Sequence, residues 1–99
     1  MTTRLSFDRE ALTALCRRQH IRRLSLFGSA LKGTARPDSD IDLLVEFVPG
    51  KEPGLLGVAD IEAELSLLLG HPVDLRTAQD LSEHFRDEVL RTAEVQYAA

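Results

Sequence analysis

The segment Ile41–Val48, rich in Ile, Leu, Val and Phe, restricts the possible folds of this 99-residue chain more than any other stretch. Apolar and β-branched residues in a run of this length are typical of a strand that is buried in a sheet. Arg22–Phe27 predicts a second strand, because leucines there alternate with polar residues. His71–Arg76 predicts a third, shorter strand.

Helical periodicity is found between and around these strands. Asp8 to about Gln19 carries apolar residues at i, i+3 and i+4, which predicts an amphipathic helix. A second apolar helix face runs from Val58 to Gly70, where glycine suits the left-handed cap. Asp80 and Glu83 have the spacing of a capping box and predict the start of a last helix. Ala93–Tyr97 is expected to be a tail or a short edge strand.

Glycine and proline mark the connections between these elements. A short helical turn is expected to begin at Ser29, followed by a turn or loop over Gly33–Asp38. Pro49–Gly57, with three glycines and two prolines, is expected to be a loop. The order of elements predicts an α/β (α+β) fold, a small mixed β-sheet with helices mainly on one face. Residues 1–99 are expected to form a single domain.

Composition excludes several classes of function. The formal net charge of −4 argues against nonspecific nucleic-acid binding as the main role, because phosphate backbones are bound by an excess of Lys and Arg. Cys16 is the only cysteine, so no internal disulfide can form. No apolar run approaches the roughly 20 residues of a membrane helix, and the first residues lack the apolar stretch of a secretory signal. We therefore expect a cytoplasmic protein without a membrane partner.

Three features carry groups that suit phosphate and metal chemistry. Gly28 and Ser29 follow one predicted strand and open a helical turn, where glycine lets the backbone approach an anion and the helix start offers N–H donors. Asp40 and Asp42 begin another strand two residues apart, so both side chains point to the same face. Asp74 lies inside an otherwise apolar strand and can complete a carboxylate triad if the two strands are neighbours.

Each feature also has a purely structural alternative. A Gly-Ser pair is most often a turn or a helix N-cap, and an isolated Asp-x-Asp is most often a solvated strand entry. The fixed spacing G-S-x10-D-x-D, however, arises by chance in on the order of one chain in a thousand. Hard divalent cations prefer oxygen ligands, and three carboxylates offset the charge of two such ions. Together the features predict phosphate chemistry assisted by metal ions.

The segment Leu26–Phe47, LFGSALKGTARPDSDIDLLVEF, resembles the signature of the nucleotidyltransferases of the DNA polymerase beta superfamily. The likeness is greatest to their minimal nucleotidyltransferase (MNT) branch. Gly70–Leu75, GHPVDL, resembles the element that bears the third carboxylate, and the likeness extends from about Arg22 to Tyr97. It implies a fold like the polymerase beta palm and an enzyme that moves a nucleoside monophosphate from a nucleoside triphosphate onto an acceptor.

The resemblance implies a role for each residue of the motif. Gly28 and Ser29 would bind the triphosphate of ATP. Asp40 and Asp42 would ligate two Mg2+ ions. Asp74 would bind the metal nearest the acceptor and help to remove the acceptor's proton.

Other charged residues near the motif are harder to assign. Lys32 stands where relatives often carry arginine, and lysine contacts phosphate without bidentate geometry. Arg36 could contact phosphate or belong to a solvated turn, and Arg76 could reach the nucleotide or the acceptor. Glu62 and Glu64 are expected on the solvated face of their helix.

The partner follows from the resemblance as well. Minimal members of this branch are typically encoded beside a helical protein of the HEPN type and act as antitoxins in toxin–antitoxin modules. The chain is therefore expected to transfer AMP from ATP to a hydroxyl, that of a tyrosine, on a HEPN-type toxin. Two alternatives stay open: an antitoxin that masks its partner without catalysis, and a nucleotidyltransferase that modifies a small molecule with a helical partner subunit. The sequence leaves the acceptor, the base and the oligomeric state undetermined.

Overall fold

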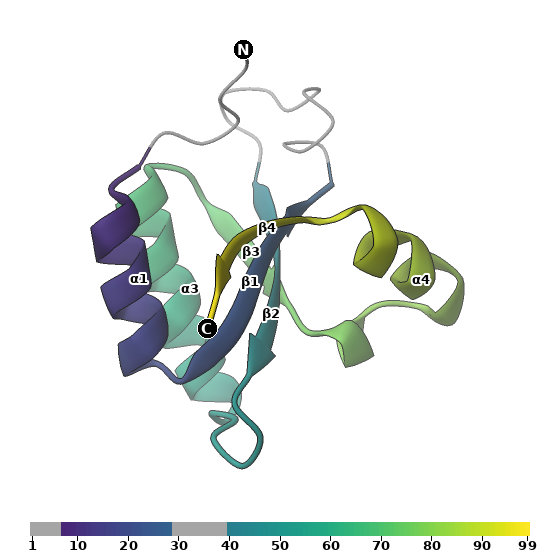
Figure 1. The fold of residues 1–99 in the computed structure, drawn as a ribbon, viewed down its shortest axis with the longest axis horizontal. Helices are drawn as coiled ribbons and strands as arrows, with labels where there is room; N and C mark the ends of the chain where they lie inside the picture. The colour runs from purple at the N-terminus through teal and green to yellow at the C-terminus, as the bar shows by residue number, and fades with distance from the viewer. Residues whose placement is uncertain (1–6, 29–39) are drawn as a thin grey trace.

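The computed structural model of the chain describes residues 7–28 and 40–99 (Figure 1). The expected helical turn from Ser29 and the expected loop Gly33–Asp38 lie outside these residues. The described elements, in chain order, are α1 (Arg9–Arg18), β1 (Ile21–Phe27), β2 (Ile41–Phe47), α3 (Leu55–Leu69), β3 (Val73–Arg76), the 3-10 helix η1 (Ala78–Asp80), α4 (Glu83–Thr92) and β4 (Glu94–Ala98). In these two ranges no helix has the length and apolar character needed to cross a membrane.

The four described strands form one sheet in the order β3-β2-β1-β4. β1 pairs antiparallel with both β2 and β4, whereas β2 and β3 run parallel. The expected mixed sheet is therefore confirmed. Of the two readings of the C-terminal residues, the edge strand is correct, because β4 pairs along β1 from Arg23 to Leu26.

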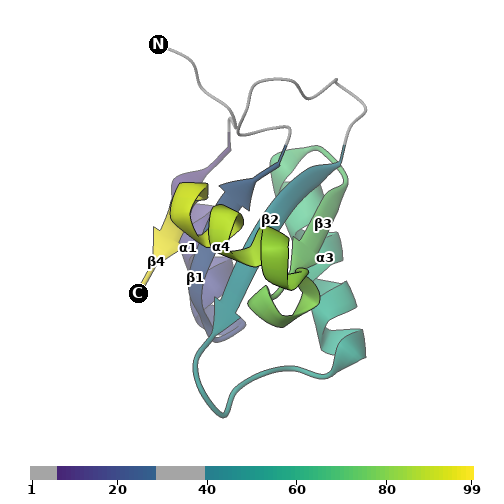
Figure 2. The same cartoon turned by 90° about the vertical axis from the view of Figure 1, so that its right-hand side faces the viewer.

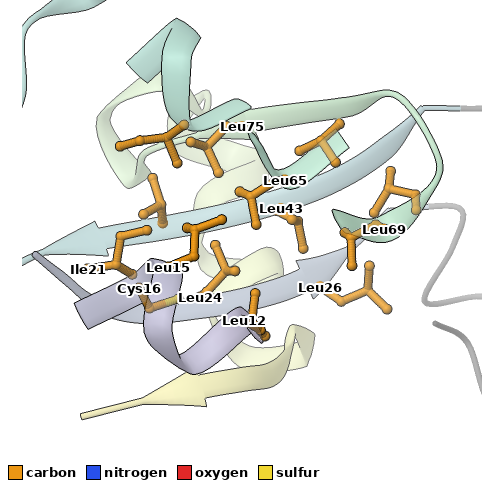
Figure 3. Close-up of a cluster of buried hydrophobic side chains, with 14 residues drawn as sticks. Leu12, Leu15, Cys16, Ile21, Leu24, Leu26, Leu43, Leu65, Leu69 and Leu75 are labelled. Carbon is orange, nitrogen blue, oxygen red and sulfur yellow. The ribbon is translucent and has the colours of Figure 1, made fainter. Parts of the chain in front are cut away.

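The main core lies between the sheet and the helices α1 and α3, which cover the same face (Figures 1 and 3). Both helices turn an apolar stripe toward the strands, and Cys16, Leu26, Ile61 and Leu65 are completely buried there. Burial of such side chains is the main stabilising contribution in a domain of this size. We call this surface of the sheet the α1/α3 face.

The opposite surface of the sheet, called the α4 face, is covered only in part, by η1 and α4 (Figure 2). A small second cluster joins Phe27 and Leu44 of the sheet to Leu81 and Val89. Among the described elements, helices therefore lie mainly on one face, as expected, while α4 packs against the other.

Two predicted helix starts are wrong. α3 begins at Leu55 rather than Val58, because Gly54 takes an extended N-cap conformation and its carbonyl already accepts the Val58 N–H at 3.0 Å. The first turn of α3 does not face the core: Leu55 is 88% exposed, so apolar periodicity misses it. The last helix, α4, begins at Glu83 and is not capped by Asp80 as expected. The Asp80 carboxylate instead accepts the backbone N–H of Thr77 at 3.0 Å.

Candidate active site

The sheet brings Asp42 and Asp74 together. Asp42 of β2 is the register partner of Asp74 of β3 in the parallel pair. The neighbours of both residues along their strands are buried in the core of the α1/α3 face. Because successive side chains of a strand point to opposite faces, both carboxylates lie on the α4 face. The condition set by the sequence, that the two strands be neighbours with the acidic groups on one face, is met.

Both carboxylates line an open cavity of about 240 Å³ where β1 ends. The remaining lining residues are Phe27, Gly28, Arg76, Leu81 and Phe85. The cavity thus has a charged wall from β2 and β3 and an apolar wall from the end of β1 and the η1–α4 segment. Phe85 is 44% exposed and meets Phe27 edge to face, with ring centroids 6.4 Å apart.

Gly28 is required at its position for two independent reasons. Its φ of +77° lies in the left-handed region, which side chains of L residues rarely adopt. A Cβ atom at this position would also lie 2.3 Å from the Asp42 Oδ2 atom. The absence of a side chain therefore lets the backbone turn after β1 while the Asp42 carboxylate lies directly against it.

The electrostatics of Asp42 are those of a carboxylate that lacks a sufficient counter-charge. Burial, followed by the negative charges of Asp74 and Asp40, raises its pKa, and only Arg76 acts in the opposite direction. Asp42 has no hydrogen bond or ion pair with any other described residue. A hard cation bound at this point would remove the repulsion between the carboxylates.

Asp40 and Asp74 differ in their surroundings. Asp40 directly precedes β2, is exposed, and acts on Asp42 through its charge. Asp74 is half-buried, and its Oδ2 atom accepts a hydrogen bond from Arg76 Nη2 at 3.0 Å. This hydrogen bond raises the pKa of the Arg76 guanidinium. Arg76, which the sequence left unassigned, is thus a component of the charged wall.

Glu62 and Arg86 hold the segments that carry the site, and sequence reasoning missed both. Glu62, expected on a solvated face, instead accepts the backbone N–H of Leu75 at 2.8 Å and so tethers β3 beside Asp74. Arg86 of α4 donates from Nε to the Ala78 carbonyl oxygen at 2.7 Å and from Nη2 to that of Leu81. These contacts fold the η1–α4 segment over the cavity. A charged residue on a helix looks solvated from sequence alone, because its backbone partner is distant in the chain.

Of the predicted site residues, Gly28, Asp42 and Asp74 line the same cavity, and Asp40 lies beside them at the start of β2. Ser29 lies outside the described residues, as do Lys32 and Arg36. Within residues 7–28 and 40–99 no three acidic, His or Cys side chains are already arranged to hold a metal ion. The donor chemistry nevertheless fits a hard divalent cation, since carboxylate oxygens meet on one face and repel each other.

Known proteins are similar to this chain in both sequence and fold. The nucleotidyltransferase domain family matches residues 8–95. The protein adenylyltransferase MntA of Thermococcus cleftensis is 40% identical over 71 residues, 72% of this chain and 70% of that protein. A solved structure described as a minimal nucleotidyltransferase is 44% identical, with a TM-score of 0.70, and the match covers 86% of this chain and 85% of that chain.

A crystal structure of a toxin–antitoxin with AMP-PNP has a TM-score of 0.73, covers 93% of this chain and 74% of that chain, and is 21% identical. At that identity the likeness concerns the fold alone. The family match, by contrast, includes every element that lines the cavity. The chain therefore belongs to the nucleotidyltransferase domain family, in agreement with its resemblance to the minimal nucleotidyltransferases, and is a nucleotidyltransferase.

Proposed function

We propose that this protein transfers AMP from ATP, with Mg2+, to a tyrosine hydroxyl of a HEPN-type helical toxin and thereby acts as its antitoxin. The observation that carries the proposal is the register pairing of Asp42 with Asp74 beneath the bare backbone of Gly28. This arrangement offers carboxylate oxygens and a close backbone approach at one point, which phosphoryl chemistry with divalent ions requires.

Each residue has a distinct task in the proposed reaction. The backbone at Gly28 and the Ser29 hydroxyl would bind the triphosphate, and the missing Cβ at Gly28 lets the Asp42 carboxylate lie against this backbone. Asp40 and Asp42 would bind the two Mg2+ ions. Asp74 would bind the ion nearest the acceptor and help to remove the proton of the acceptor hydroxyl, which attacks the α-phosphate as pyrophosphate leaves. Bound Mg2+ would supply charge neutralisation on the phosphate oxygens and a lower pKa for the acceptor. ATP as the donor implies that the reaction takes place in the cytoplasm.

The acceptor assignment rests on names of similar proteins and on the cavity. The Thermococcus cleftensis relative is named a protein adenylyltransferase, and the toxin–antitoxin of similar fold holds AMP-PNP. The cavity beside Asp74 is open and has an apolar wall, so a side chain presented by another protein can enter it. A phenol ring would lie against Phe85 with its hydroxyl toward the carboxylates.

The test uses ATP labelled at the α-phosphate, Mg2+ and a HEPN-type helical protein as the candidate partner. Label is expected on the partner with the wild-type protein and not with Asp42→Asn. Transfer by Asp42→Asn at the wild-type rate would refute the metal assignment. Label that appears only in a small product would refute the protein acceptor. An Asp40→Asn/Asp42→Asn double variant that still protects cells from the toxin would show that binding alone neutralises the partner.

A further inference from the structure

β3 is a weakly supported strand, although it carries Asp74. It has four residues, Val73–Arg76, and lies at an edge of the sheet. Among the described strands it pairs with β2 alone, in a parallel ladder, which is slightly less stable per residue than an antiparallel one. A carboxylate that must meet Asp42 at a fixed separation therefore needs support for β3 from outside the sheet.

The helix α3, which packs beside β3, supplies this support (Figure 2). The Val73 N–H donates to Ser66 Oγ at 3.0 Å, and the Leu75 N–H donates to Glu62 Oε2 at 2.8 Å. Glu62 and Ser66 have the i, i+4 spacing of neighbours on one side of a helix. Their two partners are the residues that flank Asp74 in β3. We call this pair of side chains, Glu62 and Ser66, the α3 clamp.

The α3 clamp is braced by the helix that carries it. The Ser66 hydroxyl donates to the Glu62 carbonyl oxygen at 2.8 Å, which leaves its own oxygen directed at the Val73 N–H. Ile61 and Leu65, the residues before Glu62 and Ser66, are completely buried in the main core. Because a close-packed core resists displacement, the clamp fixes β3 to a rigid helical layer.

An acceptor for each N–H group would by itself only satisfy the backbone of an edge strand. The α3 clamp does more because of the residue between its two contacts. Asp74 and Asp42 are like charges in register across β3 and β2, and their repulsion favours a β3 that moves away from its neighbour. Two hydrogen bonds to α3, one on each side of Asp74, resist that displacement.

We propose that Glu62 and Ser66 are positioning residues, which hold Asp74 at the separation from Asp42 that a divalent cation requires. The inference rests on the proposed function, since it assumes a metal site at Asp42 and Asp74. With β3 already ordered by the clamp, metal binding does not have to supply the ordering free energy of the strand. Neither residue is expected to touch the metal, and both act through Asp74.

The test measures the dissociation constant of Mn2+, without nucleotide, from the electron paramagnetic resonance signal of the free ion. Glu62→Met removes the acceptor of the Leu75 N–H, whereas Glu62→Gln keeps an acceptor oxygen. Both variants lose the same charge, so their comparison isolates the hydrogen bond. Glu62→Met is expected to bind Mn2+ about three- to tenfold more weakly than Glu62→Gln, which corresponds to the net free energy of one hydrogen bond.

Ser66→Ala is the second variant and tests the other contact of the clamp. It should weaken Mn2+ binding about two- to fivefold relative to wild type, because a hydroxyl is a weaker acceptor than a carboxylate. Glu64→Met is the matched control. It removes a carboxylate from the same helix that pairs with Arg18 and Gln19 rather than with β3, so its Mn2+ affinity should equal that of wild type within about twofold.

A double-mutant cycle with Asp74→Asn separates positioning from a general loss of stability. Asp40 and Asp42 remain in this background, so weaker Mn2+ binding is still measurable. If Glu62 acts through Asp74, the difference between Glu62→Met and Glu62→Gln should fall to about onefold. A difference that persists in the Asp74→Asn background overturns the positioning role.

The remaining outcomes distinguish this inference from the proposed function. Equal Mn2+ binding by Glu62→Met and Glu62→Gln, with Asp42→Asn abolishing binding, overturns the positioning role and leaves the metal assignment intact. Binding that Asp42→Asn does not reduce, or no binding by the wild type up to millimolar Mn2+, overturns both. Circular dichroism of each variant confirms that the protein under test is folded.

Discussion

The two faces of the sheet differ in what they bury, although the same strands supply both. On the α1/α3 face, alternate residues of β1, β2 and β3 are apolar and buried under two α-helices. On the α4 face, the intervening residues include Phe27, Asp42, Asp74 and Arg76, and the helical cover is short. One face is closed and apolar, while the other combines like charges with an open cavity.

This difference shows how a small chain can carry a site in which carboxylates repel each other. The larger apolar face supplies most of the stabilising burial, so the α4 face can hold carboxylates whose repulsion costs stability. Function and stability are therefore separated by the alternation of side chains within each strand. Substitutions on the two faces should accordingly have different signatures.

The largest contrast is expected for a carboxylate of the α4 face. Asp74→Asn should lower the rate of AMP transfer roughly 10²–10⁴-fold, the range for loss of one acid–base or charge-stabilising group, without loss of stability. Single-turnover transfer of label to the partner and urea unfolding measure the two effects. Asp60→Asn removes an exposed carboxylate of α3 and is the control. Transfer by Asp74→Asn within threefold of wild type would contradict a role for this face in chemistry.

Truncation of one leucine on each face tests where the stability resides. Leu65→Ala, in the completely buried core, should lower the free energy of unfolding by about 3–5 kcal/mol. Leu81→Ala, beside the open cavity, should lower it by about 1–2 kcal/mol, because the smaller cluster can collapse or admit water. Urea denaturation followed by circular dichroism measures the loss of stability for both variants. An equal or larger loss for Leu81→Ala would show that the α4 face also supports the fold.

A pair of glycines separates backbone strain from the geometry of the site. Gly28 and Gly70 have φ values of +77° and +72°, so alanine at either position should cost about 1–2 kcal/mol of stability. Only at Gly28 would the new Cβ meet Asp42, since nothing lies within 4 Å of one at Gly70. Gly28→Ala should therefore also lower AMP transfer roughly 10–100-fold, because a catalytic group is displaced. Equal transfer rates for the two variants, at equal loss of stability, would argue against contact between residue 28 and Asp42.

The smallest effect is the cost of the Asp42 charge itself. The folded protein raises the pKa of Asp42, so the folded state binds this proton more tightly than the unfolded state does. The free energy of unfolding therefore falls as the pH rises through the window between the unfolded pKa, about 3.9, and the higher folded pKa. Without metal at pH 7, Asp42→Asn should therefore raise Tm by about 2–5 °C. The gain should shrink as the pH is lowered through this window.

Thermal unfolding with a chelator present measures this effect, and Asp60→Asn should leave Tm nearly unchanged. A lower Tm for Asp42→Asn would mean that the charge is compensated, contrary to the pattern of like charges around it.

Much of the fold was predictable because its signals are local. The apolar run of β2 and the alternation in β1 place both strands within a residue or two of their ends. The first turn of α3 could not be predicted, because Leu55 and Leu56 face away from the core. The capping role of Asp80 was predicted for the wrong helix, because its carboxylate accepts the backbone N–H of Thr77, three residues earlier in the chain.

The site, like the fold, has one part that could be predicted from the sequence and one part that could not. Asp42 and Asp74 could be proposed from residue type, spacing and resemblance. The apolar wall could not, because Phe85 belongs to a helix stripe that reads as core and yet is 44% exposed beside the cavity. The role of Glu62 could not be predicted either, because its partner is a backbone N–H thirteen residues away along the chain.

By itself, the sequence determined which face of each strand a side chain takes, because a period of two is a property of the extended backbone and needs no partner. Only the tertiary structure decided that β2 and β3 lie side by side, so that Asp42 meets Asp74, and that Gly28 lies against the Asp42 carboxylate. Strand adjacency depends on the burial of distant apolar side chains beneath α1 and α3, which no local pattern encodes.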